Sequence, residues 1–463
     1  MLSSVIIGGG PGGTGILIWA AQNGQFSDLL STGLAVVDRR EGLGGTLGRY
    51  AVNSDSLGGV YLECLEAAST PEEIRQLSAD PVAREIEAYR NGFPPLALVN
   101  RFMHRLGAKI TAMLRANARC IVHSGTEARA LHIRQDGTVC IETATVKGGR
   151  SFITALSAVL ALGGRQQWQH QILPHGLTLS DYRLRHVITS DRLLPHEGMH
   201  EAARALRLDC GRPLVILGGS HSAYSAAWAL TRLLPAGVLG ARQITILQRS
   251  PPSVFYPGRA AAEADEYPVT EGSICSRTQR VNRLGGLRGN GRDIWRGIHR
   301  RTGAEPEPQV SSGLLADHSA GDLRNILEEA ALVVPAFGYS ARTIPIFDPQ
   351  GRRLILRADS GHPAVDQDCQ LLLNDGTALA GVFGIGLGSG YRPSGMMGGE
   401  ANFSGQANSL WLYQNDIGAI IYRGIQGRLS ALGKASSRRK TAKRDLMKAL
   451  MNLPRLSTAY SGS

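Results

Sequence analysis

The stretch VIIGGGPGGTGILIWA, residues 5–20, decides the fold of this chain. A short apolar strand runs into a glycine-rich turn, and helix-forming residues follow directly. Gly8, Gly10 and Gly13 match the pattern G-x-G-x-x-G in the strand, turn and helix context that gives it meaning. These glycines allow a tight turn, a close approach of a pyrophosphate and close packing of helix on strand, and the helix N-terminus supplies amide donors. The stretch therefore predicts a dinucleotide-binding turn.

An acidic residue closes the next strand. The segment LAVVD ends at Asp38, which is placed to accept hydrogen bonds from an adenosine ribose. The plain alternative is a turn without a ligand and a solvated acid at a strand end. We predict a Rossmann-like βαβ unit, because all of its features occur here in the expected order: a strand, the glycines, a helix, a second strand and the acid.

The same pattern returns at LVILGGSHSAYSAAWAL, residues 214–230. Small residues, Gly218 and Ala223 among them, occupy the crowded positions of the turn. At the end of the following strand, QITILQRS, Arg249 stands where an acid is expected. An acid repels a 2′-phosphate and an arginine attracts it, so this second turn predicts an NADPH site.

Composition sets the class of the protein. The chain has 463 residues, 43% hydrophobic and 19% charged, which is typical of a folded protein with two or three domains. No apolar run approaches the ~20 residues of a membrane span, and Met1 leads directly into a strand, so we expect a cytoplasmic protein without a membrane partner. The six cysteines contain no C-x-x-C pair, so neither a disulfide framework nor a metal site is predicted.

The net charge of +12 is concentrated in two segments. Residues 273–301 hold eight arginines and one acid, and residues 428–463 hold nine basic residues and one acid. Because the charge is local, a nucleic-acid surface is not predicted. The first segment is either a solvated face or a face for an acidic substrate or carrier protein, and the second is a basic tail without chemistry.

The remaining pattern predicts individual elements. The segment STPEE predicts a helix with Thr70 as N-cap and a capping box to Glu73. A longer helix is predicted over residues 96–116, and strands of period two from CIVHSG to SFITA predict a β-meander. Residues 165–212, rich in Gln, His and Pro, are interpreted as a connector.

Four further motifs carry a family resemblance. GLGGT resembles a segment that runs past a flavin, LALGG and PAFGY resemble strand ends between domains, and GVFGIG resembles a returning strand. With the two turns, they make most of residues 1–426 similar to the class B flavin-dependent monooxygenases, the N-hydroxylating, flavin-containing and Baeyer–Villiger enzymes. Leu162 and Phe337 replace the threonine of the family's two A-T-G strand ends, and no F-x-G-x-x-x-H motif is present, so the subgroup stays open.

The resemblance implies an α/β fold of two Rossmann-like dinucleotide-binding domains, with the NADPH domain inserted in the FAD domain, and a β-meander. The expected domains are the first part of the FAD domain (1–165), the connector (166–212), the NADPH domain (213–340), the second part of the FAD domain (341–426) and the basic tail (427–463). The residues expected to bind the cofactors are Gly8, Gly10, Pro11, Gly12, Gly13, Asp38, Arg39, Gly45, Thr46, Gly163, Gly218, Ser220, His221, Ser222, Arg249, Gly338, Tyr339 and Gly386.

The segment RYAVNSDSLGG, after the G-G-T, supplies the catalytic candidates Arg49, Asn53 and Asp55. Asp55 would tune a flavin hydroperoxide or shuttle its proton, and the other two would orient it. Ordinary turn chemistry of Ser-Asp-Ser is the alternative. His221 is interpreted as a turn residue that faces the cofactor rather than as a catalytic base.

The resemblance implies an FAD- and NADPH-dependent monooxygenase that moves one oxygen atom from a C4a-(hydro)peroxyflavin to a small organic substrate, such as an amine nitrogen. Its partners would be this substrate, dioxygen and a second copy of the chain. A disulfide reductase is not expected, because no cysteine pair follows the G-G-T. The alternatives are an FAD oxidase or dehydrogenase with a vestigial second nucleotide domain, and a non-catalytic nucleotide-binding protein.

Overall fold

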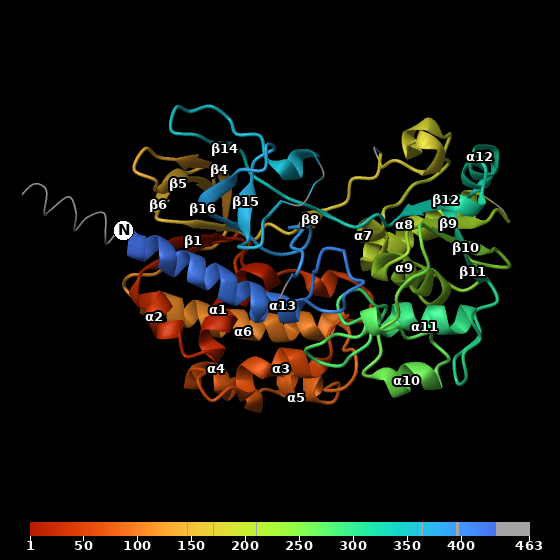
Figure 1. The fold of residues 1–463 in the computed structure, drawn as a ribbon, viewed down its shortest axis with the longest axis horizontal. Helices are drawn as coiled ribbons and strands as arrows, with labels where there is room; N and C mark the ends of the chain where they lie inside the picture. The colour runs from red at the N-terminus through yellow and green to blue at the C-terminus, as the bar shows by residue number, and fades with distance from the viewer. Residues whose placement is uncertain are drawn as a thin grey trace, which may run out of the picture.

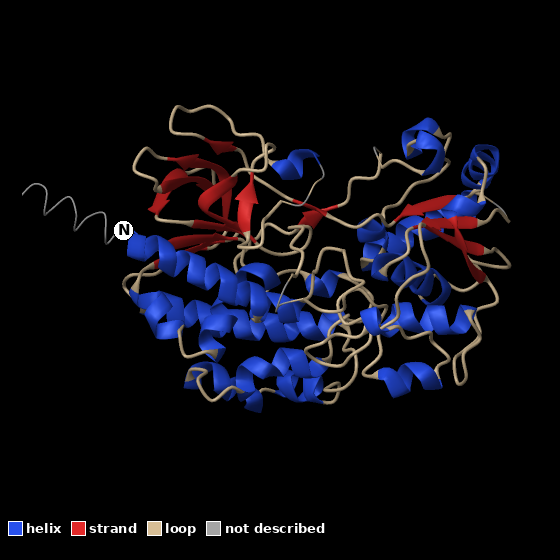
Figure 2. Ribbon diagram, in the orientation of Figure 1, coloured by secondary structure: helices blue, strands red, loops and turns tan. Residues whose placement is uncertain are grey.

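The computed structural model describes residues 1–145, 147–169, 171–209, 211–360, 362, 364–394 and 398–431. Two main sheets lie side by side, each with its own helices (Figure 1, Figure 2). The predicted basic tail falls almost wholly on residues 432–463, outside the described residues. Among the described helices, none has the length and apolar character that crossing a bilayer requires.

The first sheet has six strands, and all but one pair of neighbours run parallel. The exception is β15, which pairs antiparallel with β16. In spatial order the strands are β15 (Gln370–Leu372), β16 (Ala378–Gly384), β7 (Ala158–Leu160), β1 (Ser4–Ile7), β2 (Leu34–Val37) and β3 (Ile121–His123). The short apolar strand predicted before the first glycine turn is confirmed as β1, and every side chain of β1 and β2 is buried, as parallel strands covered on both faces require.

Helices cover one face of this sheet and a small antiparallel sheet covers the other, which makes three layers (Figure 1). The helices are α1 (Pro11–Gln22), α2 (Phe26–Ser31), α3 (Gly58–Glu66), α4 (Glu72–Arg75), α5 (Pro81–Glu87), α6 (Leu96–Ala116) and α13 (Leu410–Gln414). Residues 416–431 are also helical. The long helix predicted over residues 96–116 is confirmed as α6, whose apolar side chains recur at helical spacing and pack into the core.

The antiparallel sheet is the predicted meander with one change. Its strands are β4 (Thr126–Ile133), β5 (Val139–Thr145), β6 (Arg150–Ala155) and, parallel to β4, β14 (Ile346–Phe347). The segment CIVHSG was expected to belong here, and that expectation is wrong. Its residues form β3, which pairs in parallel with β2 at the edge of the six-stranded sheet.

The second main sheet has four parallel strands. They are β11 (Val310–Leu314), β10 (Ile244–Gln248), β9 (Leu214–Leu217) and β12 (Leu332–Pro335). The helices around it are α7 (Ser190–Leu193), α8 (His196–Leu208), α9 (His221–Arg232), α10 (Arg259–Ala264), α11 (Gly289–Ile298) and α12 (Ala320–Glu329). Alternate residues of β9 enter two different cores: Leu214 and Ile216 pack with α9, and Val215 and Leu217 pack with α12.

Two other expectations need correction. The connector contains helix α8, whose apolar residues pack in the same core as α9. The helix at STPEE is short and begins at Glu72, one residue later than expected, with Pro71 in the N-cap position. Thr70 is buried and its hydroxyl has no hydrogen-bond partner in the described chain, so the predicted capping box is absent.

The chain passes between the two main sheets through two short strands. The outgoing strand β8 (Gly164–Arg165) pairs antiparallel with the returning strand β13 (Ser340–Ala341). The two crossings therefore lie next to each other. The boundaries of the predicted domains stay predictions.

Candidate functional site

The two predicted nucleotide turns share one backbone arrangement. At Gly8, with φ +105°, a side chain would begin 2.3 Å from the carbonyl oxygen of Ala161. At Gly218, with φ +143°, it would begin 2.5 Å from the carbonyl oxygen of Ala336. Each turn therefore packs against the residue after a neighbouring parallel strand: Ala161 after β7 and Ala336 after β12. Only glycine fits at these two turn positions.

The first turn opens onto space bordered by backbone. A side chain added at Gly10 would meet only the Cα of Gly45, at 3.8 Å, and one added at Gly12 would meet the Cα of Gly386 at 3.2 Å. Open space within 4 Å is found beside Gly163, Gly338 and Gly386. Helix α1 begins here with Pro11 in its first turn and with no side-chain cap. Free amide donors at a turn whose Gly10 has open space beside it fit the pyrophosphate of FAD.

Asp38 lies against this turn. Its side chain is 6% exposed; Oδ2 accepts a hydrogen bond from the Gly9 N–H at 2.6 Å, and Oδ1 accepts one from the Arg40 N–H at 2.8 Å. Each carboxylate oxygen keeps further acceptor capacity, which suits a ribose diol. Thr46 is within 3.5 Å of the Arg40 guanidinium, and Arg39 is exposed beside them. The structure thus brings the residues expected to hold FAD together.

The second turn also leads into an uncapped helix. Ser220 is exposed at the N-cap position of α9, and its side chain makes no capping hydrogen bond. Arg249 is exposed directly after β10, and its Nη2 donates to the carbonyl of Ile172 at 3.3 Å. Since that contact is long and solvent-exposed, the guanidinium is free to turn toward a phosphate.

His221, the first residue of α9, binds a neighbouring loop. Its Nε2 donates to the carbonyl oxygen of Gly286 at 2.9 Å. Burial lowers the pKa of His221, and Arg288 lowers it further, whereas Asp55 opposes the shift. The imidazole is therefore neutral near pH 7.

Tyr339 joins the second turn to the predicted catalytic segment. Its hydroxyl interacts with the side chain of Ser222 and lies near Tyr50 and Arg49. Burial raises the pKa of both tyrosines. The Arg49 guanidinium also lies 5.2 Å from the centre of the Tyr50 ring. Tyr50 was not selected from the sequence, because a tyrosine between an arginine and an alanine carries no motif.

The other two catalytic candidates contact the beginning of α11. The N–H of Asn53 donates to Oδ1 of Asn290 at 2.7 Å. The carbonyl of Asp55 accepts a hydrogen bond from Nη1 of Arg288 at 2.9 Å, and the Asp55 side chain is exposed. Arg49, Asn53 and Asp55 therefore lie along one segment, between the six-stranded sheet's helices and the second sheet's α11.

A cavity of about 480 Å³ adjoins this segment. Ser56 and Leu57 line it, together with Arg280, Arg283 and Arg288 from the arginine-rich segment. Its volume lies within the ~300–1,000 Å³ of small-molecule sites. Sequence reasoning missed this cavity because its walls come from five separate stretches of the chain.

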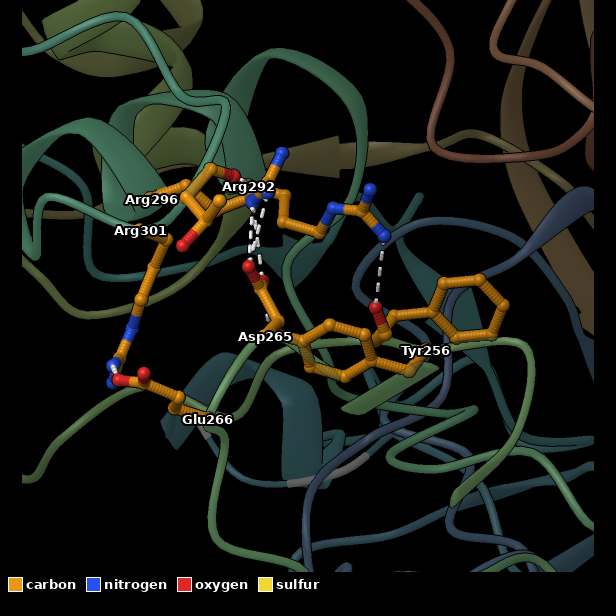
Figure 3. A network of polar contacts seen from close by, with 8 residues as sticks. Tyr256, Asp265, Glu266, Arg292, Arg296 and Arg301 are labelled. Carbon is orange, nitrogen blue, oxygen red and sulfur yellow. Dashed lines mark hydrogen bonds and ion pairs between the residues drawn. The ribbon is translucent and has the colours of Figure 1, made fainter. Parts of the chain in front are cut away.

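Other arginines of that segment have internal partners (Figure 3). Arg296 forms an ion pair of 3.0 Å with Asp265, which also accepts a hydrogen bond from the Tyr256 hydroxyl. Arg301 forms one of 3.0 Å with Glu266. These arginines stabilise the region around α11, so the segment is not uniformly a solvated face.

The amino-acid sequence is similar to that of one characterised hydroxylase along most of its length. No family model matches the chain. The chain is 30% identical over 430 residues to the CMP-5'-(3-aminopropyl)phosphonate hydroxylase of Streptomyces rubellomurinus (strain ATCC 31215). The alignment covers 91% of this chain and 97% of that enzyme.

Solved structures share the fold at low identity. The FAD-bound cadaverine monooxygenase of the desferrioxamine pathway from Erwinia amylovora has a TM-score of 0.52 at 12% identity, and the match covers 92% of this chain and 95% of that one. The reduced ornithine hydroxylase of Pseudomonas aeruginosa has a TM-score of 0.51 at 13% identity, with 92% and 99% covered. The predicted architecture of two dinucleotide-binding units is confirmed. The chain belongs to the class B flavin-dependent monooxygenases, and it is an FAD- and NADPH-dependent enzyme.

Proposed function

We propose that this monooxygenase hydroxylates the nitrogen of a primary amine. The observation that carries the proposal is the alignment along 91% of the chain with a hydroxylase whose named substrate ends in an aminopropyl group. The overall reaction would be RNH2 + O2 + NADPH + H+ → RNHOH + NADP+ + H2O, in which NADPH is oxidised and one oxygen atom leaves as water.

The first turn would hold FAD, which when bound activates dioxygen. The uncapped N-terminus of α1 would bind the pyrophosphate, and Gly10 and Gly12 would let it approach the backbone. Asp38 would accept hydrogen bonds from the adenosine ribose. The second turn would hold NADPH in the same manner, with Arg249 on the 2′-phosphate.

The segment of residues 49–57 would prepare the amine for oxygen transfer. The amine nitrogen loses one N–H proton as its N–O bond forms, and the exposed carboxylate of Asp55, next to the cavity-lining Ser56, would receive that proton and pass it to the oxygen atom that leaves as water. Asn53 and Arg49 would orient the reactants. The contact of Asp55 with Arg288 keeps this segment fixed on α11.

The test is isotope labelling with the FAD-loaded enzyme. It is supplied with NADPH, ¹⁸O2 and CMP-5'-(3-aminopropyl)phosphonate. The products are separated, and their masses are measured by mass spectrometry. We expect one ¹⁸O atom on the amine nitrogen and one molecule of NADPH consumed per product. Matched ketone and sulfide substrates serve as controls. Oxygen consumption that yields only peroxide, or labelled product from the ketone or sulfide and none from the amine, would contradict the proposal.

Three further expectations belong with this function: an acidic carrier protein, association of the chain with itself, and a cytoplasmic location. The local basic charge of residues 273–301 supports the carrier protein, and the other two stay predictions. Analytical ultracentrifugation of the holoenzyme tests self-association directly.

A further inference from the structure

We propose that the cavity beside α3 binds a phosphate or phosphonate group of the substrate through Arg283 and Arg288. The inference rests on the proposed amine hydroxylation, since it names what that amine must carry at its other end. Four arginines and two glutamates line the cavity, so its lining has an excess of positive charge.

Arg283 is buried and incompletely bonded. It is 9% exposed, its Nε donates to Sγ of Cys275 at 3.1 Å, and its guanidinium lies 5.4 Å from the centre of the Trp411 ring. Its Nη2 is buried and has no hydrogen-bond partner among the described residues. A buried donor on a charged group is costly to leave unpaired, and Arg283 lines the cavity, so a ligand oxygen bound there would supply the missing partner.

Arg288 is fixed beside it without a contacting carboxylate in the described chain. Its guanidinium stacks 4.2 Å from the centre of the Phe255 ring. Nη1 donates to the carbonyl of Asp55 and Nη2 to the carbonyl of Arg283, whereas Nε is buried without a partner. Burial lowers the pKa of Arg288 to about 10, so the group stays charged at neutral pH. Carbonyls and a ring hold the cation in place but leave its charge available.

The acidic residues nearby form no ion pair with Arg283 or Arg288 in the described chain, although the charges of Asp55 and Glu400 partly offset the lowering of the Arg288 pKa. Glu66 is already paired with Arg90. Burial raises the pKa of Glu63, and its Oε2 accepts a hydrogen bond from Nδ2 of Asn415 at 3.4 Å. Glu400 accepts a hydrogen bond from the Leu284 N–H at 2.6 Å and forms no ion pair with either arginine in the described chain.

A phosphorus oxyanion suits this arrangement better than a carboxylate. Arginine donors on two separately stacked guanidinium groups can reach different oxygens of one tetrahedral group. The hydroxyl side chains of Thr278 and Ser409 also line the cavity and offer further donors. The cavity of about 480 Å³ has room for more than the anionic group alone.

The test measures binding separately from turnover. The probe is CMP-5'-propylphosphonate, which lacks the amine and is titrated into the FAD-loaded enzyme in a calorimeter. The variants are Arg283→Gln, Arg283→Lys and Arg288→Gln. The matched control is Arg292→Gln, because Arg292 does not line the cavity. Its guanidinium lies 5.5 Å from the centre of the Tyr256 ring and donates to the Phe255 carbonyl; Figure 3 labels Arg292 and Tyr256.

We expect Arg283→Gln to raise the probe's Kd by about tenfold to a hundredfold, with Arg283→Lys in between and the control within about threefold of wild type. The NADPH Michaelis constant should not change. CMP and propylphosphonate, titrated separately, show which phosphorus group the arginines hold. Flavin content and circular dichroism establish that each variant is folded, and Arg288→Gln supplies the same test if Arg283→Gln is not.

Two results would overturn the inference: unchanged probe affinity in folded Arg283 and Arg288 variants, or a loss of NADPH affinity in place of probe affinity. The first would leave amine hydroxylation standing if the wild type still forms the hydroxylamine. Conversely, an enzyme that oxidises no amine but binds the probe through Arg283 would refute the proposed function and retain the anion site.

Discussion

Two glycines of the first turn have opposite surroundings. At Gly13 a side chain would begin 1.9 Å from the carbonyl oxygen of Gly8, whereas at Gly10 the nearest atom is 3.8 Å away. Gly13 is therefore needed by the fold itself, and Gly10 faces the space that FAD would fill. The sequence pattern treats both as members of one motif and does not separate these roles.

Replacing Gly10 by valine should give a folded but colourless protein, because the added side chain occupies the place of the pyrophosphate and meets no other backbone. Gly13→Ala is the contrasting variant and should lose at least about 1–3 kcal/mol of stability through overpacking. Flavin absorbance and thermal unfolding of the two proteins check this. Full flavin content in Gly10→Val would remove FAD from the first turn.

Arg249 is expected to determine the preference for NADPH over NADH. Its exposed guanidinium should form charge-assisted bonds with the 2′-phosphate, so Arg249→Ala is expected to raise the NADPH Michaelis constant by about tenfold to a hundredfold. NADH lacks that phosphate and should be nearly unaffected, and the NADPH penalty should shrink at high salt. Stopped-flow flavin reduction at two ionic strengths measures both. Equal weakening of both coenzymes would make Arg249 an ordinary surface charge.

At the scale of elements, sequence patterns predicted the helices and strands whose bounds depend on neighbouring residues in the chain. The bounds of β1 and α6 follow from apolar runs and helical spacing, and both agree with the sequence. The edge strand β3 was placed in the wrong sheet, because three half-exposed residues do not specify a partner. Helix α8 could have been found, since Met199, Ala202 and Leu206 follow a helical period inside its Gln- and His-rich surroundings.

The segment between η1 (Leu47–Arg49) and α3 carries the proposed proton acceptor, and its side chain is separable from its backbone contact. Arg288 binds the carbonyl of Asp55, so Asp55→Ala should keep the segment in place. We expect nearly unchanged flavin reduction by NADPH together with more peroxide and less hydroxylated product. Equal loss of both half-reactions would show that Asp55 is only a structural turn residue.

The N-terminus of α9 should respond to acid. Because burial holds the pKa of His221 below its ordinary value, the unfolded chain binds more protons below about pH 6.5, and folding stability falls as the pH is lowered through that range. His221→Gln keeps a donor for the Gly286 carbonyl but does not titrate. The fall in melting temperature between about pH 7.5 and 5.5 should therefore be smaller in the variant than in wild type. An equal fall would assign the acid sensitivity to other groups.

At the scale of the whole molecule, the candidate site depends on parts that are distant in sequence. The motif glycines were identifiable because each turn is contained within one short stretch of chain. The cavity was not, because α3, the loop of residues 278–288 and Trp411 line it together although they lie far apart in the sequence. Sequence reasoning noted the arginines but had no means of deciding which of them would find an acidic partner.

The adjacent crossings β8 and β13 bear on the order in which the protein folds. Strand β16 pairs with β7, yet the entire four-stranded sheet is synthesised between them. Closing so long a loop is entropically unfavourable, and each doubling of loop length adds about 0.6 kcal/mol. Once the intervening sheet has formed, the chain segments that enter and leave it lie side by side. The effective loop that must close for β16 to pair with β7 is then short. Pulsed hydrogen exchange during refolding should therefore show amides of β9 and β12 protected before those of β16; the reverse order would mean that the first sheet closes unaided.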